Sequence, residues 1–309
     1  MYDPMNNKFQ CIMYLFSGSK NGLQKLNFDV VTHVNYAFAI PTKDGHVLPL
    51  NNPDLAKELI AKAHAAGAKV SLSLGGWSYQ EIPLEETFYV GTNTPEKIHS
   101  MAHELVDMAA SFGFDGVDVD WEYPRTYGGS KEQFEALIGL LRELVDEKGM
   151  MLTTAVFGGV DSRNKAIPSA CDAQDRPSFD KLDYMNLMTY DCDGPKHSTY
   201  EFAENCIRYW VEQRGFEPEK LTLGLPFYGR PAPGNFNDLL ALDPDALDKD
   251  MVVVDGKEVW YNGRETLTKK VALAKRWGLG GIMVWEVSED ADDYEKSLTK
   301  VLGDAMKNA

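Results

Sequence analysis

GFDGVDVDWEYP, residues 113–124, is the stretch that decides the prediction of the fold. Its valines, glycines and aromatics are typical of a buried strand, yet it also carries four acids, Asp115, Asp118, Asp120 and Glu122. Side chains alternate between the two faces of a strand, so Asp118, Asp120 and Glu122 share one face and the apolar residues between them share the other. If the apolar face packs against helices, the three acids line the interior of a barrel.

Seven other β-rich runs occur along the chain, at residues 9–16, 30–40, 68–76, 151–158, 184–191, 221–229 and 280–287. Between most of them lie segments with apolar residues at helical spacing, at 53–67, 94–113, 130–149, 198–215 and 264–278. Strand and helix alternating through eight strands predicts an α/β fold, a closed (β/α)8 barrel of the TIM type. An open, doubly wound sheet is the main structural alternative, and the lack of a GxGxxG motif after the first strand disfavours it.

The ends of the expected helices carry their own signals. Ser130 followed by Gln133 indicates a capping box at the start of the helix over 130–149. A glycine stands where each helix should end in a left-handed turn, at Gly67, Gly113, Gly149, Gly215 and Gly278. The residues from 231 to 257 are rich in Pro, Asp and Asn, which predicts a long loop with a short hairpin at 251–261.

Composition excludes several classes of partner. The 309 residues are 44% hydrophobic and 25% charged, as expected of a globular protein with a sizeable core. The 31 Lys and Arg against 47 Asp and Glu give a net charge of −16, which repels polyphosphates and anionic lipids. We therefore expect no nucleic-acid or membrane partner. No linker divides the chain, so we expect a single barrel domain over residues 1–309. We also expect this domain to be a monomer.

The cysteines and the start of the chain bear on its environment. Cys11, Cys171, Cys192 and Cys206 show no CxxC spacing, so two disulfides and four reduced thiols both stay open. The start, MYDPMNNKFQC, lacks a basic segment followed by an apolar one, and no window approaches 18 apolar residues. The sequence thus shows no signal peptide in this chain and leaves its localisation open.

The acids on the strand point to proton-transfer chemistry. Three ionised carboxylates two residues apart in a low-dielectric interior are unfavourable, so some of them must hold protons. Such crowding keeps a carboxylic acid protonated near neutral pH, where it can act as a general acid. Glu122 ends the expected strand, and barrel active sites are built at the carboxyl ends of strands. Asp115 has the opposite parity, so we expect it to make a structural hydrogen bond.

A metal site is the alternative functional interpretation of the acids. The strand lacks the register of an EF-hand loop, and no further ligands for Mg²⁺ or Ca²⁺ can be identified. His99 and His103 lie one helical turn apart, but Ser100 stands where the zinc-protease motif HExxH needs its glutamate. We therefore expect no metal and no cofactor.

The segment DGVDVDWEYP resembles the DxxDxDxE signature of glycoside hydrolase family 18, the chitinases and their relatives. Five further segments resemble motifs of that family in the same order, namely YAFA (36–39), SLGGW (73–77), MTYD (188–191), LPFYGR (225–230) and GIMVWEV (281–287). The resemblance implies a TIM barrel that hydrolyses β-1,4-linked N-acetylglucosamine. It also favours a secreted or exported protein, although this chain shows no signal peptide. Many family members carry an α+β insertion between strands 7 and 8, and the roughly 50 residues here imply a reduced or absent insertion and a shallower groove.

The resemblance also implies roles for single residues. Glu122 would protonate the glycosidic oxygen and then act as a base, while Asp120 would orient the substrate's N-acetyl group. The N-acetyl oxygen would attack the anomeric carbon and form an oxazolinium intermediate, a retaining mechanism in which the substrate supplies the nucleophile. Asp118 would share a proton or hydrogen bond with Asp120, and Tyr190 would complete the catalytic group. The implied substrate-binding residues are Asp191, Trp285, Tyr228, Tyr14, Phe38, Ser73, Trp77 and Arg230.

By the same resemblance, Tyr190 and Asp191 would hold the acetamido group, and Trp285 would form the apolar floor under the sugar. Ser73 and Tyr14 would lie beneath Asp118 as hydrogen-bond partners. Two other functions stay open. An endo-β-N-acetylglucosaminidase acting on N-glycans or peptidoglycan would use the same chemistry, whereas a chitinase-like lectin would bind sugar without catalysis. The intact Glu122 disfavours the lectin.

Overall fold

The computed structural model describes residues 9–231 and 234–308. Eight strands form a closed barrel in the order β1-β12-β9-β8-β7-β6-β3-β2. The strand pairs β1–β12, β12–β9, β2–β3, β3–β6 and β6–β7 are all parallel. The predicted (β/α)8 barrel is therefore confirmed. The barrel strands are β1 (Gln10–Phe16), β2 (His33–Ala39), β3 (Lys69–Gly75), β6 (Gly116–Asp120), β7 (Met151–Phe157), β8 (Tyr184–Met188), β9 (Leu221–Pro226) and β12 (Gly281–Trp285).

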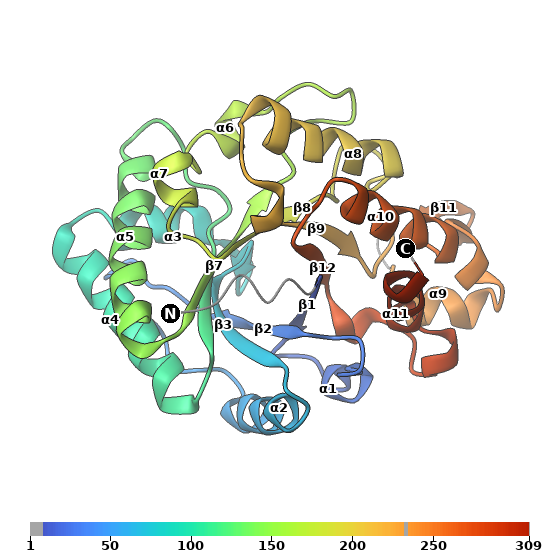
Figure 1. Cartoon of the computed structure of the whole chain (residues 1–309), viewed down its shortest axis with the longest axis horizontal. Coiled ribbons are helices and arrows are strands. Elements are labelled where there is room, and N and C mark those ends of the chain that lie inside the picture. Colours follow the sequence, from blue (N-terminus) through green and yellow to red (C-terminus); the bar gives the residue numbers. More distant parts are fainter. Residues whose placement is uncertain (1–8, 232–233, 309) are drawn as a thin grey trace. The chain divides into compact units, whose positions relative to one another are not determined.

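Two compact units divide the chain, and each is described by itself. The described part of the first unit comprises His33–Phe157 and Ile167–Asn186. It holds β2, β3, β6, β7, most of β8 and the small antiparallel hairpin β4 (Ser78–Tyr79) and β5 (Ile82–Pro83). Its helices are α2 (Pro53–Ala65), α3 (Leu84–Gly91), α4 (Pro95–Phe112), α5 (Ser130–Lys148), α6 (Pro168–Cys171) and α7 (Arg176–Phe179). In Figure 1 the cyan α4 and the green α5 lie side by side on the outside of their strands.

The second unit comprises Phe9–Thr32, Gly158–Ala166 and the chain from Leu187 onward. It holds β1, β9, β12 and the antiparallel hairpin β10 (Met251–Val254) and β11 (Lys257–Trp260). Its α-helices are α1 (Gly22–Lys25), α8 (Tyr200–Arg208), α9 (Phe236–Leu242), α10 (Arg264–Arg276) and α11 (Leu298–Asn308). A π-helical turn over Tyr209–Gln213 extends α8, and 3₁₀ turns lie at Pro218–Lys220, Ala246–Asp248, Val287–Glu289 and Tyr294–Lys296. The helices α10 and α11 pack together, as Figure 1 shows.

The apolar face of β6 packs outward, as its alternating pattern predicts. Val117 and Val119 are fully buried. Trp121, one residue beyond the strand, stacks on Phe88 of α3 with ring centroids 4.9 Å apart and meets Phe134 of α5 edge-on at 6.1 Å. Burying such large aromatic surfaces is strongly favourable, about 1.5–3 kcal/mol for a side chain of this kind. This packing fixes which face of β6 is turned away from the helices.

Several local predictions are confirmed. The five glycines expected at helix ends all have positive φ, from 66° to 87°. The predicted hairpin at 251–261 is β10–β11. Asp115 accepts hydrogen bonds from the Val70 amide at 2.9 Å and from His64 Nε2 at 2.8 Å, which is the structural role expected of it.

Other local predictions are wrong. The strand β6 ends at Asp120, so Glu122 lies two residues beyond it rather than at its last position. The capping box at Ser130 is not formed, because the Ser130 hydroxyl accepts from the Arg125 amide and donates to the Arg125 carbonyl. Gln133 instead accepts a hydrogen bond from Thr92 Oγ1. Part of the long loop expected over 231–257 is helical, since α9 falls within it.

The cysteines and the chain start can be compared with their predictions only in part. All four cysteines are buried free thiols. No helix among residues 9–231 and 234–308 is long and apolar enough to cross a membrane. Most of the start of the chain, whose lack of a signal peptide was predicted, lies outside the described residues.

Candidate active site

Three neighbouring strands of the first unit place polar side chains in one layer. In the parallel register, Ser73 of β3 lies opposite Asp118 of β6, and Asp118 lies opposite Thr153 of β7. Residues opposite one another in adjacent strands point to the same face of the sheet. The register therefore gathers two hydroxyl groups around the carboxylate of Asp118.

Asp118 is fully buried and held by these neighbours. Ser73 Oγ donates to Oδ2 at 2.7 Å and Thr153 Oγ1 donates to Oδ1 at 2.6 Å. Asn186 of β8 adds a longer contact from its amide nitrogen to Oδ1 at 3.4 Å. The hydrogen bond expected between Ser73 and Asp118 is thus present. Such donors compensate for the lost hydration of a buried carboxyl group and fix its orientation.

Asp120 is in a different situation although it is only two residues away. It is 4% exposed, and its Oδ1 atom has no hydrogen-bond partner. Burial first, and the neighbouring charges of Glu122 and Asp118 next, raise the pKa of Asp120 well above its ordinary value. The group is therefore able to hold a proton at pH values where an exposed aspartate is ionised, and it keeps one oxygen free for a ligand.

The backbone at the end of β3 lies very close to the backbone of Asp120 at the end of β6. The Gly76 amide donates to the Asp120 carbonyl oxygen at 2.8 Å. Gly75 has φ of +117°, and a Cβ atom there would lie 2.3 Å from the same carbonyl oxygen. Only glycine fits this contact, because other residues both clash and disfavour positive φ. Gly75 of SLGGW is thus required by the close packing of β3 against the end of β6.

Glu122 lies just past the end of β6 and is half-buried. Tyr123 donates a hydrogen bond from its hydroxyl to Glu122 Oε2 at 3.0 Å, and its ring packs edge-on against Phe157 at 5.7 Å. Both residues belong to the first unit. A partly exposed carboxyl group beside two buried acids is able to exchange protons with a bound molecule.

The second unit collects another group of predicted site residues. Asp191 follows β8 with φ of +58°, and Arg230 donates from Nε to Asp191 Oδ1 at 2.9 Å. The ring of Tyr228 meets Tyr190 edge-on at 6.2 Å and lies 5.4 Å from the Arg230 guanidinium. Asp191 and Arg230 line a cavity of about 480 Å³ together with His197. Asp191, His197 and Arg230 therefore surround one cavity, and Tyr228 and Tyr190 pack beside them.

The electrostatics of Asp191 are opposite to those of Asp120. Burial acts to raise the pKa of Asp191, but hydrogen bonds from His197 and Arg230 and the Arg230 charge outweigh it and lower the pKa to about 2. His197 Nδ1 lies 3.3 Å from Asp191 Oδ1 and accepts a hydrogen bond from the Asp191 backbone amide, also at 3.3 Å. Burial raises the pKa of Tyr228 well above its ordinary value. Asp191 is therefore a fixed anion and Tyr228 a fixed hydrogen-bond donor near neutral pH.

The remaining predicted aromatics lie at the ends of strands. In the second unit, Trp285 of β12 packs against Tyr14 of β1 with centroids 5.6 Å apart. In the first unit, Phe38 of β2 lies next to the Gly76 backbone, where an added Cβ would meet its ring at 2.7 Å. Trp77 is 62% exposed. The structure thus groups Trp285 with Tyr14, and Phe38 with the SLGGW segment.

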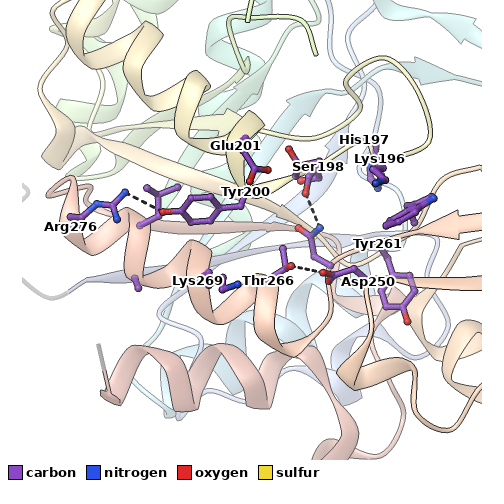
Figure 2. Close-up of a pocket in the computed structure, with 15 residues that line it drawn as sticks. Lys196, His197, Ser198, Tyr200, Glu201, Asp250, Tyr261, Thr266, Lys269 and Arg276 are labelled. Carbon is purple, nitrogen blue, oxygen red and sulfur yellow. Dashed lines mark hydrogen bonds between the residues drawn. The ribbon is translucent and has the colours of Figure 1, made fainter. Parts of the chain in front are cut away.

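A larger cavity of the second unit, of about 600 Å³ (Figure 2), is also lined by His197 but by none of the predicted site residues. Many of its polar lining groups are paired with each other. Thr266 donates to Asp250 at 2.6 Å, and Arg276 donates to the Tyr200 hydroxyl at 3.1 Å, as Figure 2 shows. Size alone does not identify an active site, and the acids of β6 have chemistry that this cavity lacks.

Lys270 lies fully buried behind that cavity. Its Nζ donates to Ser198 Oγ at 2.7 Å, to the Ser198 carbonyl at 2.8 Å and to Asn262 Oδ1 at 2.7 Å. Burial lowers the pKa of Lys270 to about 7. Ser198 in turn donates to the Thr189 carbonyl at 2.7 Å. Lys270 therefore secures the loop that carries Asp191 and His197.

The histidine pair considered for zinc has an ordinary arrangement. His99 and His103 stack on α4 with ring centroids 4.1 Å apart. Within residues 9–231 and 234–308, no group of three or more His, Cys, Asp and Glu side chains has a geometry that could hold a metal ion.

Sequence reasoning missed several residues of the site. Thr153 and Asn186 both hold Asp118, and each lies on a strand already recognised, so inward parity together with the strand order would have found them. Tyr123, the partner of Glu122, was quoted but given no role. His197 contacts Asp191, and no local sequence signal links the two residues.

Comparison with known proteins identifies the family of this chain. The sequence pattern of the family described as Glycosyl hydrolases family 18 matches residues 10–290. A "chitinase-like effector" of Moniliophthora roreri is 29% identical over 67% of this chain and 54% of that protein, and "Probable chitinase 2" of Drosophila melanogaster is 27% identical over 87% and 68%. The chain therefore spans about half to two thirds of the length of these relatives.

Solved structures are similar over nearly the whole chain. The crystal structure of the GH18 chitinase ChiB from the chitin utilization locus of Flavobacterium johnsoniae superposes with a TM-score of 0.79, at 26% identity, over 97% of this chain and 94% of that one. The family pattern covers 281 of the 309 residues, from 10 to 290. This chain belongs to glycosyl hydrolases family 18.

Proposed function

We propose that the protein hydrolyses β-1,4-linked N-acetylglucosamine chains with retention of configuration, using the substrate's own N-acetyl oxygen as the nucleophile. The observation that carries the proposal is Asp120, a buried acid with a free oxygen and a raised pKa, two residues before the half-buried Glu122. Asp118 supports it from within a set of hydroxyl and amide donors.

In the first step, Glu122 donates its proton to the glycosidic oxygen while the N-acetyl carbonyl oxygen attacks the anomeric carbon. The bond from that carbon to the leaving oxygen breaks, and the leaving chain departs as an alcohol. The product is an oxazolinium ion, and Asp120 in its ionised form stabilises the positive charge in a poorly hydrated environment. Supplying the nucleophile from within the substrate removes the cost of positioning a second group.

In the second step, Glu122, now ionised, removes a proton from water as the water oxygen attacks the anomeric carbon. The oxazolinium ring opens, the N-acetyl group is restored, and Glu122 regains its proton. Tyr190 and Asp191 would hold the acetamido group, Tyr228 and Arg230 would support Asp191, and Trp285 would stack under the sugar ring. Phe38, Trp77 and Tyr14 would contact the sugar or the residues around it.

The proposal is tested by comparing an N-acetylglucosamine oligomer with its fully deacetylated counterpart. We expect cleavage of the first and no measurable cleavage of the second, because the deacetylated chain lacks the nucleophile. A thiazoline analogue of N-acetylglucosamine should inhibit competitively. Comparable cleavage of both oligomers would show that the substrate does not supply the nucleophile.

A panel of substrates separates the chitin-type activity from its alternatives. Products from chitin oligomers, peptidoglycan and a high-mannose N-glycan would be identified by mass spectrometry. We expect cleavage of the chitin oligomers alone. Release of an N-glycan would instead identify an endo-β-N-acetylglucosaminidase, and oligomer binding without cleavage would identify a lectin.

A further inference from the structure

Lys270, on the helix α10 of the second unit, is a buried lysine that the proposed mechanism does not use. It is 0% exposed. Its neighbour Lys269 is exposed and pairs with Glu265 at 2.6 Å, which is the usual situation of a lysine. Moving a charged amine out of water is unfavourable unless hydrogen bonds replace its hydration. The contacts of Lys270 inside the protein must therefore compensate for that cost.

Among the described residues, Lys270 Nζ has three hydrogen-bond partners, and all three are acceptors. They are Ser198 Oγ at 2.7 Å, the Ser198 carbonyl at 2.8 Å and Asn262 Oδ1 at 2.7 Å. The Ser198 hydroxyl proton is donated to the Thr189 carbonyl at 2.7 Å, so Oγ offers its lone pairs to Lys270. Asn262 Nδ2 donates to the Ser198 carbonyl at 2.8 Å, which leaves Oδ1 to accept from Nζ. Three acceptors need three N–H donors, and a lysine has three only in its ammonium form.

The segment held in this way is the loop over residues 189–198, which we call the Asp191 loop. Its two ends are joined by the hydrogen bond from Ser198 Oγ to the Thr189 carbonyl. Next to Ser198, His197 accepts a hydrogen bond at Nδ1 from the Asp191 amide at 3.3 Å. Asp191 and His197 both line the cavity of about 480 Å³ in the candidate site. The place of Asp191 in that cavity therefore depends on where the buried amine holds Ser198.

Loss of one proton from Lys270 is incompatible with this arrangement. The neutral amine has two N–H donors and a lone pair, so one of the three acceptors would face that lone pair. Burial lowers the pKa of Lys270 to about 7. The titratable groups around it, Cys206 and Glu201 of α8, Cys192 of the loop and Asp250, act in the opposite direction but more weakly. The amine therefore changes its form near neutral pH, and one contact of the Asp191 loop changes with it.

We propose that Lys270 is a positioning residue of the active site, which in its ammonium form holds the Asp191 loop in the shape that presents Asp191 to the bound sugar. Loss of the proton loosens the loop and weakens substrate binding without altering the bond-breaking step. This inference rests on the proposed function for the identity of the sugar. It gives Lys270 no contact with the substrate, since the lysine acts through Ser198 and the loop.

The first measurement follows the loop itself and needs no substrate. Hydrogen–deuterium exchange of a peptide covering residues 189–198 is compared in the parent and in Lys270→Met at about pH 6 and about pH 8.5, with labelling times adjusted for the intrinsic exchange rates. At the lower pH the loop should exchange roughly tenfold faster in the variant, and at the higher pH the difference should shrink to less than about threefold. A peptide covering β6, in the first unit, serves as the internal reference for global unfolding.

Two further samples keep this test decisive even where Lys270→Met does not fold. In the parent alone, the loop peptide should exchange about threefold faster, relative to the β6 peptide, at the higher pH than at the lower one. Ser198→Ala removes one acceptor and leaves the lysine in place, so its loop should exchange faster than that of the parent at both pH values.

The second measurement concerns substrate binding. At about pH 6, Lys270→Met should raise the KM for an N-acetylglucosamine oligomer roughly three- to tenfold and change kcat less than about twofold. In the parent, KM should rise by a similar factor toward the higher pH, and this rise should be absent from Lys270→Met. Glu122 and Asp120 titrate in both proteins, so the difference between the two pH profiles reports Lys270.

Lys269→Met is the matched control, because Lys269 precedes Lys270 on the same helix but is exposed and pairs with Glu265. It should alter neither loop exchange nor KM. Loop exchange that is unchanged in Lys270→Met, or accelerated by the same factor at both pH values, would overturn the inference, since a purely structural lysine acts alike at any pH. A fall in kcat at constant KM would also overturn it. A protein that shows the expected loop exchange but cleaves no glycan would uphold the role of Lys270 and reject the proposed function.

Discussion

Asp120 and Asp191 are the same kind of residue near the carboxyl ends of two barrel strands, β6 and β8, yet their surroundings act on them in opposite ways. Asp120 is buried beside other acids, and its pKa is raised. Asp191 is two-fifths exposed beside Arg230 and His197, and its pKa is lowered to about 2. The position on a strand thus decides where a carboxyl group lies, while the neighbouring charges decide whether it holds a proton.

The largest expected effect on activity concerns Glu122, the proposed proton donor. Glu122→Gln keeps the size of the side chain and removes the exchangeable proton, so kcat should fall by about 10³-fold or more. The kcat of both proteins is measured from the steady-state hydrolysis of an N-acetylglucosamine oligomer. Glu143→Gln, an exposed change on α5, serves as the control and should have no effect. Full activity in Glu122→Gln would remove Glu122 from the mechanism.

The next effect tests Asp120 itself. Asp120→Asn retains the shape but cannot balance the charge of an oxazolinium ion, so kcat should fall by about 10²-fold. Asp115→Asn is the matched control, because Asp115 lies in the same segment but bonds to Val70 and His64. That control should leave kcat unchanged even if it lowers the melting temperature. A similar loss of kcat in both variants would mean that Asp120 has only a structural role.

A smaller effect is expected at the other aspartate. Arg230→Met removes the ion pair at 2.9 Å and leaves Asp191 without its main cation, so KM should rise by roughly three- to tenfold with little change in kcat. The control is Arg264→Met, which breaks a similarly exposed pair with Asp248 at 2.6 Å. If kcat fell instead of KM rising, Arg230 would act on the chemical step rather than on binding.

The smallest effects are on stability, and they should have opposite signs. The raised pKa of Asp120 means that its folded state binds more protons than the unfolded state, so its contribution to stability is complete below about pH 4 and is lost as the pH rises. Asp120→Asn removes an ionisable group whose burial makes ionisation unfavourable, so the variant should lose this pH dependence and become more stable than the parent by about 1 kcal/mol near neutral pH. The two proteins should converge near pH 4.

Asp191 should behave in the reverse manner. Its pKa of about 2 in the folded state lies below the unfolded value of 3.8. Its contribution to the stability of the folded state is therefore present above about pH 4 and is lost as the pH falls toward 2. Asp191→Asn should therefore lower stability at neutral pH, by less than about 1 kcal/mol because solvent screens a partly exposed pair. Thermal unfolding between pH 3 and pH 8 measures both variants. Shifts of the same sign would contradict the proposed difference between the two sites.

Much of the fold and part of the site could be predicted. The eight β-rich runs were placed correctly because short-range alternation and helical spacing are local properties of the chain. The same alternation separated Asp118 and Asp120 from Asp115, and it predicted that Trp121 would pack outward. The exact end of β6 was missed, since a strand ends where its partners stop bonding to it, and those partners are distant in sequence.

The sequence by itself determined the order of the strands and helices, the row of acids and the motifs shared with the family. Only the tertiary structure decided what each acid contacts. Thr153 and Asn186 reach Asp118 from 35 and 68 residues away, and Arg230 reaches Asp191 from 39 residues away. Lys270 secures the Asp191 loop through Ser198, 72 residues from it. Hydrogen bonding and the pKa of a buried group depend on the groups within a few ångströms, and only the register and packing of the folded chain bring those groups together.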